Sequence, residues 1–273
     1  MIDFSEDELL RYSRNILVQD IGVEGQERIR RARVLVIGAG GIGSPVLLYL
    51  AAAGVGTLGI ADGDRIDLSN LQRQILFTTA DAGNRKAECA AERVHSLNPG
   101  VKTVVYPEYL DASNIADIIK DYDFIIDGTD NYAAKYLIND ACVLHGKAFS
   151  HGGVVRFGGQ VMTHVPGSAC FRCVFGEPPA PEFAPTCAQA GVLGAVVGIV
   201  GSIQATEALK YITGAGELLV DRLLTIDAST MAFHRINIAK NPECPLCGSH
   251  PAITTLTDYE LPHCNIRDNG NNK

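Results

Sequence analysis

The chain has 273 residues, of which 47% are hydrophobic and 20% are charged, so it can bury the core of one large α/β domain. Its formal net charge of −8 argues against nucleic acid or an anionic membrane as the main partner, and any polyphosphate site must be a local basic cluster. The acidic start, MIDFSEDELL, has no apolar signal-peptide core, and the longest apolar stretch, residues 190–203, is shorter than the ~20 residues of a membrane span. We therefore expect a cytoplasmic protein without a membrane partner.

The N-terminal segment predicts a helix, because Ser5 and Glu8 form a capping box ahead of an apolar-periodic run. This helix carries Arg14, for which a solvated helical face is the simplest explanation. The basic residues 27–33 are explained in a similar way, by a surface helix that leads into the first strand.

Residues 33–43, RVLVIGAGGIG, predict a buried central strand that runs into a phosphate-binding loop. Glycines let the loop turn tightly and approach a phosphate, and the following helix points its N-terminal amides at the anion. The glycines are Gly38, Gly40, Gly41 and Gly43, of which the last lets the helix pack against the strand. A second strand over residues 57–61 ends at Asp62, about 20 residues past the glycines, where a ribose-binding acid is expected. This pattern predicts a nucleotide site and does not say which nucleotide binds.

A polar loop follows Asp62 where a plain repeat would have a short turn. The loop contains Ser69, Asn70 and Arg73, and Lys86 begins a helix that ends near residue 97. A third strand and its crossover helix follow, at residues 102–106 and 114–120.

A fourth strand, residues 124–127, ends in the sequence DGTDN, and a helix over residues 132–145 follows. The motif includes Asp130 and Asn131. Because ligands of such sheets lie beyond the carboxyl ends of the strands, we expect Asp62 and Asp130 to converge beside the glycine loop.

The character of the sequence changes after residue 148. Residues 154–164 predict an antiparallel hairpin with Gly158 and Gly159 between its two strands. A long helix and two further strands are expected at residues 192–212, 219–226 and 232–238.

These elements predict an α/β fold with a Rossmann-like, mostly parallel sheet that antiparallel strands continue. We expect residues 1–250 to form one domain and residues 251–273 to form a tail that is partly disordered.

Two CxxC pairs, formed by Cys170, Cys173, Cys244 and Cys247, predict a four-thiolate structural zinc site that staples the C-terminal segment to the core. The alternative, a redox pair, requires a CxxC at a helix start after a strand, and neither pair is expected in that position. Cys187 lies just beyond residues 176–185, which hold four prolines and predict a mobile or extended crossover.

The glycine loop alone fits an NAD-dependent oxidoreductase, or a non-catalytic nucleotide-binding scaffold, as well as an ATP-using enzyme. Arg73 and Lys86 favour ATP, because they can hold phosphates, while Asp130 can hold Mg²⁺. His151, near a strand end, either lines the crevice or is a satisfied structural histidine.

Together these motifs resemble the MoeB/ThiF/HesA family, the bacterial relatives of ubiquitin-activating enzymes. The resemblance rests on GAGGIG, Asp62, SNLQRQ at residues 69–74, Lys86, DGTDN, the paired CxxC motifs and the dipeptide Thr186-Cys187. It extends from RYSRNI at residues 11–16 to Cys247, and the tail at residues 250–260 is similar to that of some molybdopterin-synthase adenylyltransferases. Some members carry a fused rhodanese domain, which we do not expect within these 273 residues.

The resemblance implies that the C-terminal Gly-Gly of a small ubiquitin-like sulfur carrier is adenylated by Mg-ATP, with release of pyrophosphate. It implies that Asp62 binds the ribose and that Asp130 binds Mg²⁺. Phosphate contacts are implied for Asn70, Arg73 and Lys86, and Ser69 and Asn131 belong to the same motifs. Arg14 is implied to reach the triphosphate of the other subunit of a homodimer, which replaces the solvated-face explanation.

Sulfur from a donor such as a cysteine desulfurase or a rhodanese then displaces AMP to give a thiocarboxylate. By the same resemblance, Cys187 either carries that sulfur or is a bystander thiol. The molybdopterin and thiamine branches share the motifs, so the sequence does not decide between these pathways.

Overall fold

The computed structural model describes residues 4–178 and 191–259. Its centre is an eight-stranded sheet with the strand order β3-β2-β1-β4-β5-β6-β7-β8. The strands are β1 (Arg33–Ile37), β2 (Thr57–Ala61), β3 (Lys102–Tyr106), β4 (Phe124–Asp127), β5 (Ala148–Val155), β6 (Gly158–His164), β7 (Arg222–Asp227) and β8 (Ala232–Asn237). The pairs among β1 to β5 are parallel, and the pairs from β5 to β8 are antiparallel, which confirms the expected fold class.

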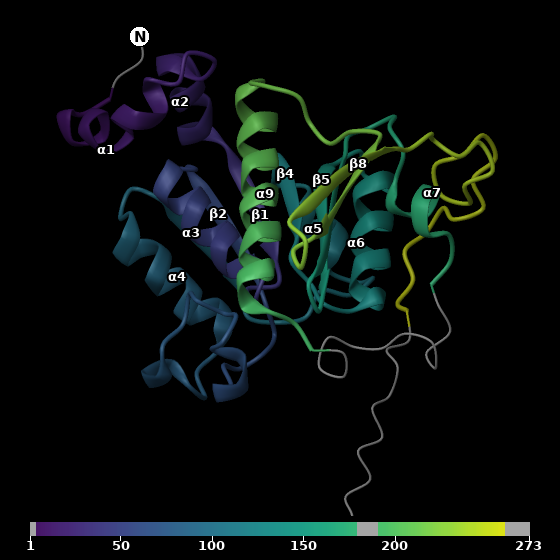
Figure 1. Ribbon diagram of the computed structural model, residues 1–273, viewed down its shortest axis with the longest axis horizontal. Coiled ribbons are helices and arrows are strands. Elements are labelled where there is room, and N and C mark those ends of the chain that lie inside the picture. The colour runs from purple at the N-terminus through teal and green to yellow at the C-terminus, as the bar shows by residue number, and fades with distance from the viewer. Residues whose placement is uncertain (1–3, 179–190, 260–273) are drawn as a thin grey trace, which may run out of the picture.

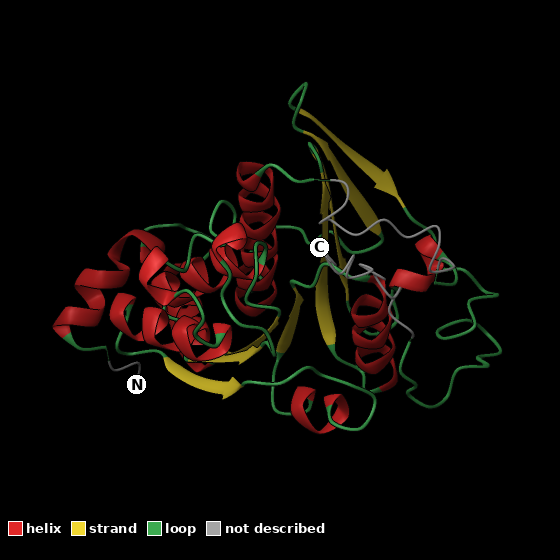
Figure 2. Ribbon diagram, turned by 90° about the horizontal axis from the view of Figure 1, so that it is seen from below, coloured by secondary structure: helices red, strands yellow, loops and turns green. Residues whose placement is uncertain are grey.

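Helices cover both faces of this sheet, as Figures 1 and 2 show. The helices are α1 (Glu6–Ile16), α2 (Gly22–Arg31), α3 (Gly43–Ala53), α4 (Lys86–Leu97), α5 (Ile115–Ile119), α6 (Tyr132–Leu144), α7 (Phe171–Phe175) and α9 (Gly194–Thr213), with short 3₁₀ turns η1 (Leu68–Asn70) and η2 (Thr79–Asp81). The helices α3, α4 and α9 lie on one face, and α5 and α6 lie on the other (Figure 2). No helix in the described ranges is long and apolar enough to cross a bilayer.

The continuous apolar run of β1 follows from this double covering. Val34 and Val36 pack in the core on the α3 and α9 side, whereas Leu35 and Ile37 pack in the core on the α5 and α6 side. All of them are buried, because successive side chains of a strand point to opposite faces and both faces are covered.

The hairpin of β5 and β6 differs from its prediction. Its turn lies at Arg156 and Phe157, where Arg156 adopts a left-handed φ of 54°, and not at Gly158 and Gly159. Both glycines belong to β6, and a Cβ at Gly159 would lie 2.7 Å from Val200 Cγ2 of α9. Gly159 is thus required for the packing of α9 against the sheet. Two adjacent glycines are also typical of a turn, and the prediction therefore placed the turn at these residues.

The N-terminal helix has the expected capping box of Ser5 and Glu8. It is anchored by Tyr12, whose buried ring lies where a Cβ of Gly54 would be, at the C-terminal end of α3. The Tyr12 hydroxyl accepts a hydrogen bond from Asn98 Nδ2 at 2.9 Å. The helix α1 is therefore fixed at the end of α3 that lies away from the glycine loop.

A buried charged network joins β4, β5 and α6. Asp127 Oδ2 accepts from His151 Nδ1 at 2.9 Å and from Lys135 Nζ at 3.1 Å, and Lys135 also donates to Gly152 O. Although burial acts to raise the pKa of Asp127, the Lys135 ammonium and the bond from His151 hold it well below its ordinary value. Burial lowers the pKa of His151 to about 4, with a further contribution from Lys135, so the ring is neutral at pH 7.

We predict that this neutral ring makes stability fall in mild acid. The unfolded His151, with a pKa near 6.5, binds a proton more readily than the folded one, with a pKa of about 4. Its contribution to stability is therefore complete above pH 6.5 and is lost as the pH falls to 4. Between these limits, the free energy of unfolding in urea should fall by up to about 3 kcal/mol more in the wild type than in His151→Gln.

The exposed His95 offers the matched control, since His95→Gln should keep the wild-type pH dependence. Equal pH slopes in the wild type and in His151→Gln would contradict the prediction.

Candidate functional site

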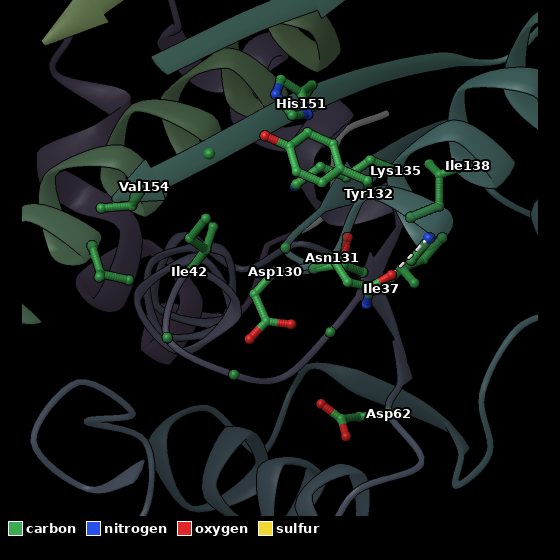
Figure 3. A pocket seen from close by; sticks show the side chains of 18 of the residues that line it. Ile37, Ile42, Asp62, Asp130, Asn131, Tyr132, Lys135, Ile138, His151 and Val154 are labelled. Carbon is green, nitrogen blue, oxygen red and sulfur yellow. Dashed lines mark hydrogen bonds between the residues drawn. The ribbon is translucent and has the colours of Figure 1, made fainter. Parts of the chain in front are cut away.

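A cavity of about 530 Å³ opens beyond the carboxyl ends of β1, β2 and β4, where the sequence predicted a crevice. Most of the predicted nucleotide-binding residues line it, namely Gly38, Gly40, Gly41, Asp62, Arg73, Lys86, Asp130 and Asn131. The other predicted residues in the described part of the chain, Gly43, Ser69, Asn70 and Arg14, do not line it. Figure 3 shows Asp62 and Asp130 reaching into the same space from two walls.

The glycines of the loop have different tasks. Gly38 has a φ of +92°, and a Cβ at Gly43 would lie 1.9 Å from Gly38 O, so both positions exclude side chains. Gly43 thus lets α3 pack against β1, as expected. At Gly40 the nearest atom to a Cβ would be Gln74 Nε2, at 3.5 Å. Gly40 therefore leaves open space on the cavity side, which fits the close approach of a phosphate.

Asp62 is fixed by the loop that it faces. Its Oδ2 accepts from Ala39 N and its Oδ1 accepts from Asp64 N, both at 2.8 Å. Burial raises the pKa of Asp62. Each carboxylate oxygen keeps further acceptor capacity, so the group can accept hydrogen bonds from ribose hydroxyls.

Ser69 and Asn70 shape the polar loop and do not enter the cavity. Asp67 Oδ1 accepts from Ser69 N at 2.8 Å and from Ser69 Oγ at 2.6 Å, which caps η1. The half-buried Arg73 donates to Ser69 O at 3.2 Å and directs its side chain along the cavity wall.

Lys86 starts α4 and is only 5% exposed. Its Nζ lies 2.7 Å from Asp64 Oδ2, and Tyr109 also donates to Asp64. Asp64 and Tyr109 line the cavity, and the sequence analysis assigned a role to neither. The only sequence signal for Asp64 is its position two residues after Asp62.

Asp130 is exposed at the cavity, in the loop between β4 and α6. Among the described residues, no hydrogen bond or ion pair holds its carboxylate, so it is available to a ligand. Asn131 caps α6, because its Oδ1 accepts from Ala134 N at 2.8 Å. The structural task of Asn131 is thus to begin the helix directly after Asp130.

The far end of the cavity is mainly apolar. Phe171, Phe175 and Val192 line it together with His151, whose ring centroid lies 4.5 Å from that of Phe171. His151 therefore lines the crevice and is also a satisfied structural histidine, so the two explanations are both correct. The aromatic pair was missed, because nothing in the sequence brings the first CxxC segment to the strand ends.

The paired cysteines form one cluster, as predicted. Their ligand atoms lie within 4.8 Å of one another, and the closest pairs are separated by 3.3 to 3.9 Å. A tetrahedral zinc with Zn–S bonds of about 2.3 Å places its sulfurs about 3.8 Å apart, so the cluster fits this metal. Burial raises the pKa of the Cys170 thiol, so a cation is needed for all four sulfurs to be thiolates.

One premise of the sequence analysis about these cysteines was wrong. Cys170 is the N-cap of the short helix α7, so a CxxC does occupy a helix start. The second pair nevertheless closes over the first, since Cys170 Sγ lies 3.7 Å from Cys244 Sγ. This closure favours a shared metal over an isolated redox pair.

The residues between the first two cysteines anchor the cluster to α6. The buried Arg172 donates to both carboxylate oxygens of Asp140, at 2.8 and 2.9 Å, and to Tyr259 Oη at 2.5 Å. Phe171 N donates to Asn139 Oδ1 at 2.8 Å. Arg172 therefore links the first CxxC segment both to α6 and, through Tyr259, to the C-terminal segment.

Arg14 lies far from the cavity of its own chain. It is exposed on α1, close to Tyr12 and hence to the C-terminal end of α3, whereas the glycine loop lies at the N-terminal end. The eleven residues of α3 span about 16 Å. Cys187 lies outside the described residues.

The ThiF family model matches residues 12–246. A sulfur carrier protein adenylyltransferase of Thermus thermophilus is 44% identical over 270 residues, which cover 97% of this chain and 99% of that protein. A probable adenylyltransferase/sulfurtransferase MoeZ of Mycobacterium tuberculosis is 48% identical over 261 residues, which cover 94% of this chain and 65% of that protein.

Among solved structures, a crystal structure of E. coli MccB has a TM-score of 0.76 and covers 87% of this chain and 75% of its own. At 24% identity this likeness concerns the fold alone. The family match extends over most of the chain and includes the glycine loop, the cavity residues and three of the clustered cysteines. The chain belongs to the ThiF family.

Proposed function

We propose that this protein uses ATP to adenylate the C-terminal glycine carboxylate of a small ubiquitin-like sulfur carrier. The observation that carries the proposal is one cavity that gathers a glycine loop, a ribose acid, two basic residues and an unpaired acid. The names of the similar proteins support it, since the one from Thermus is a sulfur carrier protein adenylyltransferase and the one from Mycobacterium is a probable adenylyltransferase/sulfurtransferase.

The reaction needs positioning and charge stabilisation more than a catalytic base. A carboxylate oxygen of the carrier attacks the α-phosphorus, the bond from that phosphorus to the pyrophosphate oxygen breaks, and an acyl-adenylate and pyrophosphate are formed. In this scheme Asp62 orients the ribose, and Arg73 and Lys86 neutralise the charge on the phosphates. Asn70 acts on the phosphates only after a small rearrangement, since it does not line the cavity.

Mg²⁺ is proposed to be held by Asp130, and the ion would offset the negative charge of the phosphates there. The exposure of this carboxylate and its lack of a described protein partner support this role. Zinc is proposed to bind at Cys170, Cys173, Cys244 and Cys247 as a structural ion. The spacing of the sulfurs supports that assignment.

An NAD-dependent oxidoreductase or a non-catalytic scaffold is the weaker candidate. Hydride transfer does not require Arg73, Lys86 and Asp130 around one phosphate loop, and a scaffold requires no charged groups that are free to meet a ligand. The relatives named above give neither alternative any support.

A homodimer is proposed in which Arg14 reaches the triphosphate of the partner subunit. Its position near the C-terminal end of α3, a helix about 16 Å long that has the glycine loop at its other end, supports action across an interface.

The proposals for sulfur transfer, location and domain bounds are based on the sequence alone. Sulfur from a donor such as a cysteine desulfurase or a rhodanese displaces AMP, with Cys187 as the candidate carrier of that sulfur. We keep the cytoplasmic location, the domain at residues 1–250 and the tail at residues 251–273 as proposals. The carrier belongs to the molybdopterin pathway, the thiamine pathway or another sulfur pathway.

The adenylation site is tested by Asp130→Ala. This change should lower carrier-dependent exchange of pyrophosphate into ATP by roughly 100-fold or more, because it removes the proposed magnesium ligand during phosphoryl chemistry. Candidate carriers from the molybdopterin and thiamine pathways serve as substrates. The thermal midpoint should not change, since Asp130 is exposed.

Asp121→Ala is the matched control, because Asp121 is an exposed acid at the opposite end of β4. Exchange by Asp130→Ala at nearly the wild-type rate would refute the magnesium assignment.

The zinc assignment predicts about one zinc per chain in the purified protein. Cys244→Ser should lower the thermal midpoint strongly, because the free energy of metal binding contributes to folding. Cys89→Ser, at a half-buried thiol outside the cluster, should have a much smaller effect. A folded, metal-free protein with disulfides at the clustered cysteines would overturn the assignment.

The dimer is tested by mixing two inactive variants, Arg14→Ala and Asp130→Ala. Subunit exchange should restore part of the activity, because one site of each mixed dimer then has both residues intact. If exchange of subunits is confirmed and activity does not return, Arg14 does not act across an interface.

A further inference from the structure

Asp64 is a carboxylate in the proposed phosphate site whose presence the adenylation scheme does not explain. It lines the same cavity as Arg73 and Lys86. Its Oδ2 accepts from Lys86 Nζ at 2.7 Å, and its Oδ1 accepts from the hydroxyl of Tyr109. A carboxylate that merely faced a polyphosphate would repel it. The presence of Asp64 in this site therefore needs a different explanation.

The main chains of Asp64 and Lys86 are held together by a short antiparallel ladder. Lys86 N donates to Asp64 O at 3.0 Å, and Ile66 and residues 83–84 exchange further backbone hydrogen bonds at 2.8 and 2.9 Å. This ladder closes the base of the polar loop, so the two backbones have a fixed separation. The Lys86 side chain is buried, and the only hydrogen-bond partner of its ammonium in the described part of the chain is Asp64, which fixes where the ammonium lies.

The same residue is connected to the ribose acid. Asp64 N donates to Asp62 Oδ1, and Asp62 Oδ2 accepts from Ala39 N of the glycine loop, both at 2.8 Å. A continuous series of bonds therefore runs from the glycine loop through Asp62 and Asp64 to Lys86. This series of bonds connects Asp62, which is proposed to bind the ribose, with Lys86, which is proposed to bind the phosphates.

The pair also keeps Asp64 charged. Burial acts to raise its pKa, but the bonds from Lys86 and Tyr109 outweigh burial and lower the pKa below its ordinary value. The ring of Tyr109 packs against Gly63, where a Cβ would lie 2.8 Å from Tyr109 Cδ2. Tyr109 thus fixes the carboxylate from the side opposite Lys86.

We infer that Asp64 is the positioning residue for Lys86, which it holds toward the phosphates of a bound nucleoside triphosphate. Asp64 touches no reacting atom and acts through the ammonium that it holds. This inference rests on the proposed function, since it takes ATP as the ligand of the cavity.

The test is a double-mutant cycle of Asp64→Asn with Lys86→Met, in which equilibrium binding of Mg-ATP and of adenosine is measured by calorimetry. Asn retains the size of Asp, the backbone bond to Asp62 and one acceptor oxygen that can serve Tyr109. It replaces the charged acceptor of Lys86 with an NH₂ donor, which cannot hold the ammonium. Asp64→Asn should weaken Mg-ATP binding at least fivefold and change adenosine binding less than twofold. A general disruption of the cavity would weaken both ligands.

The sign of the effect is informative, because removal of an acid near phosphates would otherwise tighten ATP binding. The double variant should bind Mg-ATP no more than twofold weaker than Lys86→Met alone, since Asp64 acts through Lys86. Asp64→Glu should recover part of the affinity. Glu88→Gln removes the same charge from an exposed position on α4 outside the cavity and should bind like the wild type.

Tighter or unchanged ATP binding by Asp64→Asn would overturn the inference. The inference would also be overturned if the losses of ATP affinity in the two single variants added up in the double variant and disappeared when Mg²⁺ was omitted. Such a result would make Asp64 a metal ligand. Pyrophosphate exchange by the wild type is measured separately with the candidate carriers. If exchange is absent while the binding cycle behaves as expected, the proposed function fails and the positioning role stands.

Discussion

The site depends on a close approach of three backbone segments at glycines. A Cβ at Gly43 would lie 1.9 Å from Gly38 O, and one at Gly128 would lie 2.9 Å from the same oxygen. The end of β1, the start of α3 and the end of β4 can therefore meet only if these positions carry no side chains. Their meeting brings Asp62 and Asp130 to opposite walls of one cavity, and it leaves room at Gly40 for an anion. A methyl group at either of these glycines would separate the loop from the strand end that carries Asp130.

The cavity gathers charged groups of both signs in a protein whose net charge is −8. Its basic groups Arg73 and Lys86 lie in the part that holds the glycine loop, whereas Phe171 and Phe175 line another part with apolar side chains. This division suits two substrates of different character. In the proposed reaction the polyphosphate meets the basic groups, and the part of the cavity that Gly153, Gly158 and Gly159 line is left for the C-terminal glycines of the carrier.

Local patterns predicted most of the fold, because they depend on neighbours in the sequence. The capping box at Ser5 and the strand at residues 102–106 were placed correctly. The turn of the β5–β6 hairpin was misplaced, since Gly159 serves the packing of a helix that begins 35 residues later. Residue types and spacing sufficed to predict that Asp62 and Asp130 meet at one cavity and that the four cysteines form one cluster. The pairing of Lys86 with Asp64 and that of Arg172 with Asp140 were missed, because they join residues 22 and 32 positions apart and follow no periodic pattern.

One residue connects the cavity with the cysteine cluster. Phe171 stands between two of the clustered cysteines, and its ring lines the cavity against His151. A movement of this ring on ligand binding would displace the turn that supplies two of the four sulfurs. Thermodynamic reciprocity then applies. If the cluster binds its metal more tightly when the cavity is filled, the cavity binds its ligand more tightly, by the same factor, when the metal is bound.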